Sequence, residues 1–159
     1  MIKEVSGDIL LTSAQVIAHG VAPNDHFDSG LAASLREEFP SMVKDFRHYC
    51  KVENPAPGGV WLWGSAEGLK IANLLTQEPS NGFGHPGHAT LQHVSHALKQ
   101  LAKLARQEHF SAIAVPKLAT GVGKLPWNEV KPLLEKHLGE LDIPVYVYAT
   151  YVKGQKAAE

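Results

Sequence analysis

Residues 111–130, SAIAVPKLATGVGKLPWNEV, are the most informative stretch of this 159-residue chain. The apolar run 112–115 is typical of a buried strand, the loop 117–124 follows it, and a helical pattern comes next. In open α/β sheets, ligands bind beyond the carboxyl ends of the strands. Gly121 and Gly123 would let backbone N–H groups approach an anion, and the following helix N-terminus adds a favourable dipole. The stretch therefore predicts a phosphate-binding loop, although a plain strand-to-helix turn would need the same glycines.

This loop matches neither of the common nucleotide motifs. Lys124 is followed by Leu125, where a nucleoside-triphosphate loop would carry a magnesium-binding Ser or Thr. Nor does the segment from Gly121 to Gly123 continue into the third glycine of a dinucleotide fingerprint. The ligand class is therefore left open by this loop alone.

A second unit of the same kind lies near the N-terminus, in residues 16–40, VIAHGVAPNDHFDSGLAASLREEFP. A short strand over 16–18 leads into the polar loop 19–29, and a helix begins after Gly30. Small residues after Gly30 suit a helix start that touches a diphosphate, whereas an ordinary capped helix is the alternative. Two strand–loop–helix units in one small chain favour a shared, phosphate-bearing ligand.

The remaining pattern predicts an α/β domain with a parallel or mixed sheet. Strands are expected over 2–5, 16–18, 60–63, 69–75, 112–115 and 145–148. Helices are expected over 31–39, 41–50, 89–109 and 128–138. Residues 1–152 form the predicted domain, and residues 153–159 look like a loose tail.

Composition excludes several classes of protein. Fifteen Lys and Arg nearly balance sixteen Asp and Glu, and the net charge of −1 argues against broad binding to nucleic acid or an anionic membrane. Cys50 is the only cysteine, so no intramolecular disulfide can form, which fits a reducing compartment. No apolar run is long enough for a signal peptide or a membrane span. We expect a soluble, cytoplasmic protein, a monomer, without a cofactor.

Several short motifs, in their order, resemble those of the macrodomain family of ADP-ribose-binding modules. The resemblance extends over most of the chain and rests on VSGDIL at 5–10, HGV at 19–21, SGLA at 29–32, FP at 39–40, YCK at 49–51, IANL at 71–74 with Gln77, the stretch from VPK at 115–117 through GVG at 121–123 to PW at 126–127, and VYVY at 145–148. It is greatest for the branch that holds ADP-ribose-1″-phosphate phosphatases and hydrolases of glutamate-linked ADP-ribose.

The resemblance implies a three-layer sandwich, with a mixed central sheet and helices on both faces, that binds ADP-ribose or an ADP-ribosylated substrate. Asp8 would hold the adenine amino group, Ile9 would supply a backbone N–H, and Tyr148 would flank the base. Phe27 would cover the distal ribose. The diphosphate would lie between two groups of residues: Ser29, Gly30, Leu31 and Ala32 on one side, and Thr120, Gly121, Val122, Gly123 and Lys124 on the other.

Departures from the family pattern bear on catalysis. Ala22 replaces the expected asparagine, and residues 25–28 replace a glycine-rich segment with Asp-His-Phe-Asp. The family members that cleave ADP-ribose from glutamate carry a catalytic lysine and aspartate, and the corresponding residues here are Gln77 and Gly123. A lysine nucleophile is therefore not supported.

The remaining candidate for chemistry is His19, which can act as a general acid or base near neutral pH. Asp25 or Asp28 could orient it or activate water, whereas a histidine that only bonds the backbone at a strand end is the alternative. A hydrolase, a non-catalytic ADP-ribose reader and a module for another nucleotide all remain open. His85, His88, His93 and His96 lack acidic or cysteine partners, so no metal site is expected.

Overall fold

Six strands form one sheet in the part of the chain that the computed structural model describes, residues 1–79 and 87–159. The strand order is β1-β6-β5-β2-β4-β3. The strands are β1 (Ile2–Gly7), β2 (Val16–Val21), β3 (Val60–Gly64), β4 (Lys70–Leu75), β5 (Ile113–Pro116) and β6 (Val145–Tyr151). The helices are the short 3₁₀ turn η1 (Ile9–Leu11), α1 (Gly30–Glu38), α2 (Pro40–Glu53), α3 (Leu91–Gln107) and α4 (Trp127–Leu138).

The sheet is mixed, as the resemblance implied. β1 pairs with β6, β6 with β5, β5 with β2 and β2 with β4, all in parallel, and only the edge strand β3 runs antiparallel to its neighbour. The parallel strands therefore end at one edge of the sheet, where α/β proteins form their ligand sites.

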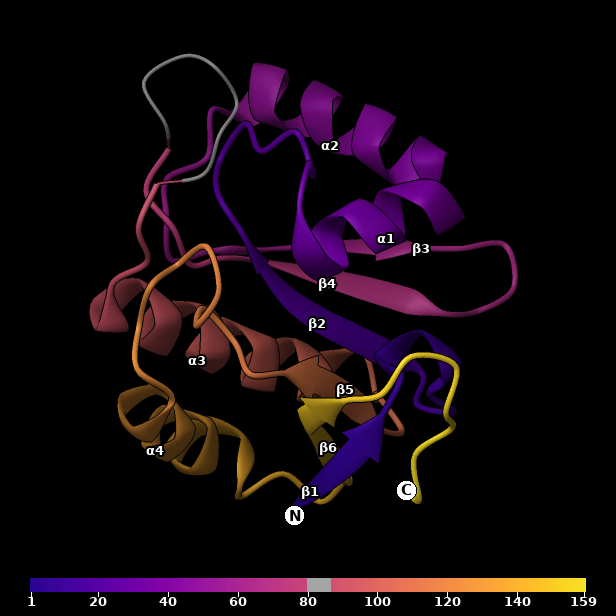
Figure 1. Ribbon diagram of the computed structural model, residues 1–159. Coiled ribbons are helices and arrows are strands. Elements are labelled where there is room, and N and C mark those ends of the chain that lie inside the picture. Colours follow the sequence, from indigo (N-terminus) through magenta and orange to yellow (C-terminus); the bar gives the residue numbers. More distant parts are fainter. Residues whose placement is uncertain (80–86) are drawn as a thin grey trace.

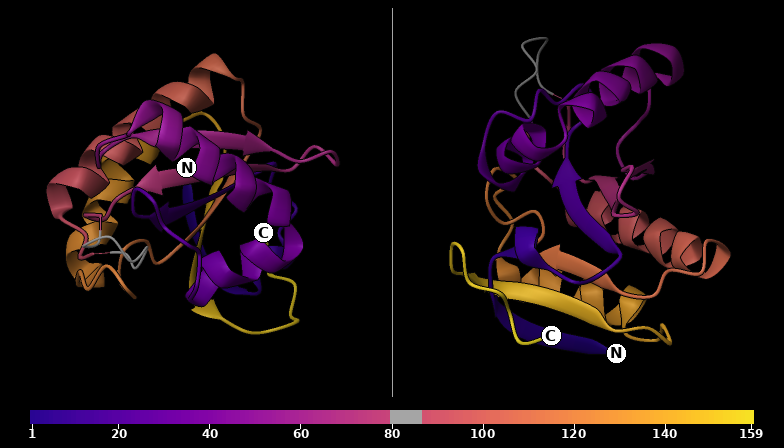
Figure 2. Two further views of the ribbon diagram at one scale, coloured as in Figure 1. Left: turned by 90° about the horizontal axis from the view of Figure 1, so that it is seen from above. Right: turned by 90° about the vertical axis from the view of Figure 1, so that its right-hand side faces the viewer.

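Helices cover both faces of this sheet (Figure 1). α1 and α2 lie on one face, and α3 and α4 lie on the other, as Figure 2 also shows. The apolar stripe of α3 packs Val94, Leu98 and Leu101 into one core, whereas Leu35 of α1 and Phe46 of α2 pack into a second core on the opposite face. The three-layer α/β prediction is confirmed.

Predicted element positions agree with the structure, with two corrections of physical interest. β2 continues to Val21, so His19 lies inside a paired strand rather than at its end. Residues 153–159 are not a loose tail: Asp8 N donates to the Gln155 carbonyl at 2.7 Å, and Ala157 is buried. Backbone hydrogen bonds and a small buried side chain fix this segment, and neither leaves a hydrophobic pattern in the sequence.

The histidine-rich stretch is only partly described, since His85 lies outside the described residues. Among the residues with described positions, no group of three His, Cys, Asp or Glu side chains could hold a metal ion. In that same part of the chain, no helix combines the length and the apolar character that crossing a membrane requires.

Candidate functional site

Two adjoining cavities lie at the carboxyl edge of the sheet. The first has a volume of about 400 Å³ and is lined by residues around Asp8, Tyr148 and Tyr151. The second has a volume of about 190 Å³ and is lined by residues around His19 and Gly123. Both are also lined by the same three residues, Gly30, Leu31 and Pro116. The cavities therefore form one elongated cleft between α1 and the loop that follows β5.

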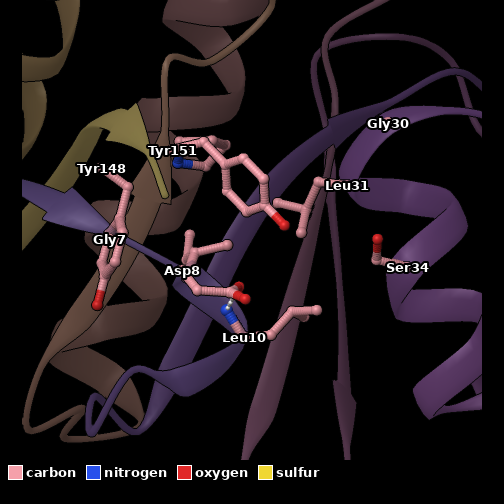
Figure 3. Close-up of a pocket in the computed structure, with 10 residues that line it drawn as sticks. Gly7, Asp8, Leu10, Gly30, Leu31, Ser34, Tyr148 and Tyr151 are labelled. Carbon is pink, nitrogen blue, oxygen red and sulfur yellow. Dashed lines mark hydrogen bonds between the residues drawn. The ribbon is translucent and has the colours of Figure 1, made fainter. Parts of the chain in front are cut away.

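Asp8 lines the first cavity, and backbone N–H groups hold its carboxylate (Figure 3). It caps η1, and its Oδ1 accepts a hydrogen bond from Leu10 N at 3.1 Å. Oδ2 accepts a second hydrogen bond, from Gly154 N at 3.0 Å. Each oxygen of a carboxylate can accept more than one hydrogen bond, so a buried Asp8 can still receive one from a ligand. Ile9, the other predicted residue here, also lines the cavity.

Two tyrosines of β6 line this cavity in different ways. Tyr148 is buried, and its hydroxyl donates to Glu159. Burial, followed by the hydrogen bond to Glu159, raises the pKa of Tyr148 to about 12. Tyr151 was not predicted as a residue of the site. It is 64% exposed, and Figure 3 shows its ring lying between Asp8 and Leu31. Its ring is therefore open to contact with a planar group in this cavity.

The second cavity is lined in part by the start of α1 and by the loop after β5. α1 begins at Gly30, whose φ of 60° is left-handed, and its cap residue Ser29 makes no side-chain cap hydrogen bond. Opposite lies the loop after β5, which contributes Ala119, Gly121, Val122 and Gly123 to the lining, and Ala32 of α1 completes the predicted set there. Unsatisfied N–H groups of a helix N-terminus attract anions. This end of the cleft therefore offers backbone N–H groups to an anion.

Gly123 is required by packing. A β carbon there would lie 2.5 Å from the carbonyl oxygen of Ala119 and 2.9 Å from the Cβ of Ala89. An aspartate, which the resemblance associates with catalysis at this position, has no room without a rearrangement of the loop.

Lys117, and not Lys124, is the lysine that lines the second cavity. Lys124 is exposed with a left-handed φ of 65° and does not line the cleft. Thr120 also lies outside the lining, and its hydroxyl donates to the Lys117 carbonyl at 2.7 Å. Thr120 therefore supports the turn in this structure. Residue type alone does not tell which of the two lysines, Lys117 or Lys124, faces the cleft.

His19 lines the second cavity from within β2. Its Nε2 lies 2.6 Å from Oδ1 of Asn73, whose amide group donates to the Trp61 carbonyl at 3.3 Å. Oδ1 therefore accepts the Nε2 proton, and Nδ1 carries the lone pair of the neutral ring. Burial lowers the pKa of His19 to about 4, despite the opposing hydrogen bond to Asn73. The imidazole is neutral at physiological pH.

The loop 22–29 places its two candidate acidic residues, Asp25 and Asp28, differently. Asp25 is buried and lines the second cavity, but its oxygens accept hydrogen bonds from Ala22 N at 3.0 Å and Phe27 N at 2.9 Å. Burial raises the pKa of Asp25, against the effect of these hydrogen bonds. Asp28 lies outside the cleft lining and pairs with Arg36 at 2.8 Å. The structure therefore does not bring Asp28 to His19.

Phe27 does not cover the cleft. It is fully buried, and its ring lies edge-on to His19 at a centroid distance of 5.7 Å and to Phe46 at 5.3 Å. Its φ of 59° is unusual for a bulky side chain. Core packing explains both features, because the ring fills the space between β2 and α2.

Sequence reasoning also missed several lining residues. These are Gly7, Leu10, Ser34 and Tyr151 in the first cavity, Gly20, Gln77, Lys117 and Ala119 in the second, and Pro116 in both. Gln77 lies just beyond the end of β4 and lines the second cavity, at the position where this sequence departs from the lysine of the catalytic family members.

A family model described as Macro domain matches residues 19–134. A curated relative from Thermosipho africanus, a "DNA ADP-ribosyl transferase-DNA ADP-ribosyl glycohydrolase fusion protein", is 26% identical over 91% of this chain. The chain spans only 40% of that relative's length. An "ADP-ribose 1''-phosphate phosphatase" from Meyerozyma guilliermondii is 26% identical, over 90% of this chain and 96% of the relative.

A solved structure with a similar fold is that of Thermosipho africanus DarTG in complex with ADP-ribose. Its TM-score is 0.79 at 20% identity, over 98% of this chain and 42% of the other. At this identity the similarity shows the fold alone.

Proposed function

Because the chain belongs to the macrodomain family, we propose that its cleft binds ADP-ribose or an ADP-ribosyl group on a larger substrate. The observation that carries this proposal is the continuity of the two cavities across Gly30, Leu31 and Pro116. A ligand with a diphosphate between its two ends needs an anion-binding group between the sites for those ends, and the start of α1 at Gly30 can supply it. The volumes of about 400 and 190 Å³ together are in the range of ligand pockets, roughly 300–1,000 Å³.

The proposed pose places adenine in the first cavity. Asp8 accepts the hydrogen bond of the exocyclic amino group, and Tyr151 stacks on the base. The diphosphate lies at the start of α1, with Gly121 to Gly123 on its other side. The distal ribose occupies the second cavity beside His19, with Lys117 within the same lining. The relatives named above act on ADP-ribosyl compounds, which supports this choice of ligand.

Hydrolysis is a second candidate, and it depends on His19. As a neutral imidazole in the cavity lining, His19 could accept a proton from water that attacks an ADP-ribosyl ester or ADP-ribose 1″-phosphate. A pKa near 4 makes this a weak base, and Gln77 supplies neither a nucleophile nor a charge. The geometry thus supports binding more strongly than turnover.

Calorimetry with purified protein tests the ligand. We expect micromolar binding of ADP-ribose, weaker binding of AMP and ADP, and no heat from ribose 5-phosphate at the same concentration. Equal affinity for AMP and ADP-ribose would mean that the second cavity does not contribute, and would point to a different nucleotide.

Variants of neighbouring β6 residues test the pose. Tyr151→Ala should weaken ADP-ribose binding by about tenfold, since base stacking on an aromatic ring contributes roughly 1–3 kcal/mol. The matched control is Thr150→Ala, because Thr150 is exposed on the same strand and does not line the cavity. Equal loss in both variants would contradict the pose.

Turnover is tested separately with ADP-ribose 1″-phosphate and an ADP-ribosylated glutamate peptide. Loss of product in His19→Gln with ADP-ribose binding retained would support a hydrolase. Equal activity of His19→Gln and wild type would exclude His19 as the base, and no activity in wild type would leave a reader of ADP-ribose.

We further propose a monomer in a reducing, cytoplasmic compartment without affinity for bare nucleic acid; the single cysteine supports the compartment, and the net charge of −1 argues against nucleic-acid binding. Light scattering and a gel-shift titration with unmodified DNA test the first and last of these expectations.

A further inference from the structure

We propose that the C-terminal segment, residues 152–159, fixes the base selectivity of the cleft by holding Asp8 and Tyr148 in position. This inference rests on the proposed function, because it concerns the adenine end of the same site. The segment follows β6 and folds back beside the end of β1, as the yellow trace in Figure 1 shows.

The first step is the turn that brings the segment back. Val152 N donates to the Gly7 carbonyl at 3.1 Å, and Gln155 N donates to the Val152 carbonyl at 3.2 Å. Gly154, between them, has a left-handed φ of 75°. The turn therefore depends on a residue that tolerates this conformation.

The second step is the contact with Asp8. The Gln155 carbonyl accepts from Asp8 N at 2.7 Å, and Gly154 N donates to Oδ2 of Asp8 at 3.0 Å. The backbone and the carboxylate of Asp8 are thus both held by the returning segment. The remaining partner, Leu10 N, belongs to the local turn and fixes Oδ1 alone. The orientation of the carboxylate toward the cavity depends on both.

Close packing at Gly7 is independent support. A β carbon on Gly7 would lie 2.8 Å from the Gln155 carbonyl oxygen and 2.9 Å from the Cβ of Ala157. Ala157 is itself buried. The end of β1 and the returning segment are therefore fitted to each other, and the contact is not a chance approach of a mobile end.

Glu159 extends the same support to Tyr148. Its carboxylate accepts hydrogen bonds from the Tyr148 hydroxyl and the Thr12 hydroxyl, and from Ser13 N at 3.0 Å. Tyr148 is one of the residues that line the first cavity. Residues outside the cleft lining thus restrain two of the side chains that line the adenine end of the cleft.

The test uses two substitutions at Gly154, where a β carbon would meet no atom within 4 Å. Gly154→Val disfavours the left-handed conformation while its β carbon meets no neighbouring atom, so we expect the N–H to move away from Asp8. Gly154→Asn is the matched control, because asparagine adopts that conformation far more readily than other residues. Affinities for ADP-ribose and for inosine diphosphate ribose, which carries a carbonyl oxygen in place of the adenine amino group, are measured by calorimetry.

We expect wild type and Gly154→Asn to share one preference for ADP-ribose over the inosine analogue. In Gly154→Val that preference should fall by about tenfold, with little change in affinity for the analogue, because a hydrogen bond to a charged group is being misaligned. A general loss of folding would instead lower both affinities together.

The second variant is Glu159→Ala, which should weaken both nucleotides by a few fold through Tyr148, with Gln155→Ala as an unaffected control because only its backbone is used. An unchanged preference in Gly154→Val, or an equal loss for both nucleotides, overturns this inference alone. Failure of the wild-type protein to bind ADP-ribose overturns the proposed function, and the inference with it.

Discussion

At the scale of single residues, the protonation of His19 makes the stability of the fold depend on pH. Its folded-state pKa of about 4 lies below the value near 6.5 expected in an unfolded chain. Between these values the unfolded chain binds a proton that the folded protein does not, so stability falls as the pH decreases through this window. We expect His19 to remove roughly 2–3 kcal/mol from the free energy of unfolding between about pH 7 and pH 4.5.

Urea unfolding at several pH values measures this effect. The His19→Gln variant should lose that part of the pH dependence while keeping a side chain able to donate to Asn73. Parallel pH profiles for wild type and variant would show that His19 does not carry the shift.

The two aspartates of the loop 22–29 should differ sharply on substitution. Asp25→Ala leaves the buried N–H groups of Ala22 and Phe27 without their acceptor, and we expect a loss of roughly 1–3 kcal/mol in the free energy of unfolding. Asp28→Ala removes only an exposed ion pair with Arg36, and we expect a change within about 0.5 kcal/mol and unchanged ADP-ribose affinity. A large loss of affinity in Asp28→Ala would contradict the placement of that side chain outside the cleft.

At the scale of elements, the loop after β5 offers a matched pair of glycines. Gly123→Ala forces a β carbon against the Ala119 carbonyl, whereas Gly121→Ala places one in open space. We expect ADP-ribose affinity to fall by about tenfold or more in the first variant, because the loop must move. In the second it should stay within about twofold. Equal affinities of the two variants, measured by calorimetry, would mean that the loop shape at Gly123 does not matter for the ligand.

The elements themselves follow from apolar periodicity, and for this reason the sequence predicted most of them. Leu91, Val94, Leu98 and Leu101 repeat at the spacing of one helix face, and their packing into the core confirms that α3 lies against the sheet. Periodicity could not predict the returning segment, since Gly154 and Gln155 act through backbone groups. The resemblance pointed to Tyr148, and Tyr151 on the same strand was missed because alternation along β6 does not say which side chains line a cavity.

Residues of the cleft could be predicted from the sequence where the backbone or the packing requires a glycine. Gly30 and Gly123 are two such residues, and both line the cleft. Phe27 and Lys124 were misplaced because loop geometry decides whether a side chain faces the cleft, the core or the solvent. No pattern of residue types separates these three directions in an irregular loop.

At the scale of the whole molecule, the cleft lies between parts of the chain that come from both of its halves. Asp8 and Gly30 come from the first quarter of the sequence, whereas Pro116 and Tyr151 come from the last third. A ligand that spans both cavities therefore bridges β1, α1, β5 and β6, and it must raise the stability of the fold as a unit.

Thermal unfolding with ligand measures this coupling. At an ADP-ribose concentration about 100 times its Kd, binding to the folded state alone adds about 2.7 kcal/mol to the free energy of unfolding. For a domain of this size each kcal/mol raises Tm by roughly 2–4 °C, so we expect an increase of about 5–10 °C. AMP at the same concentration fills only the adenine end and should raise Tm by less. A shift from ADP-ribose no larger than that from AMP would mean that the two cavities do not act as one site, because the second cavity would then add nothing to the free energy of binding.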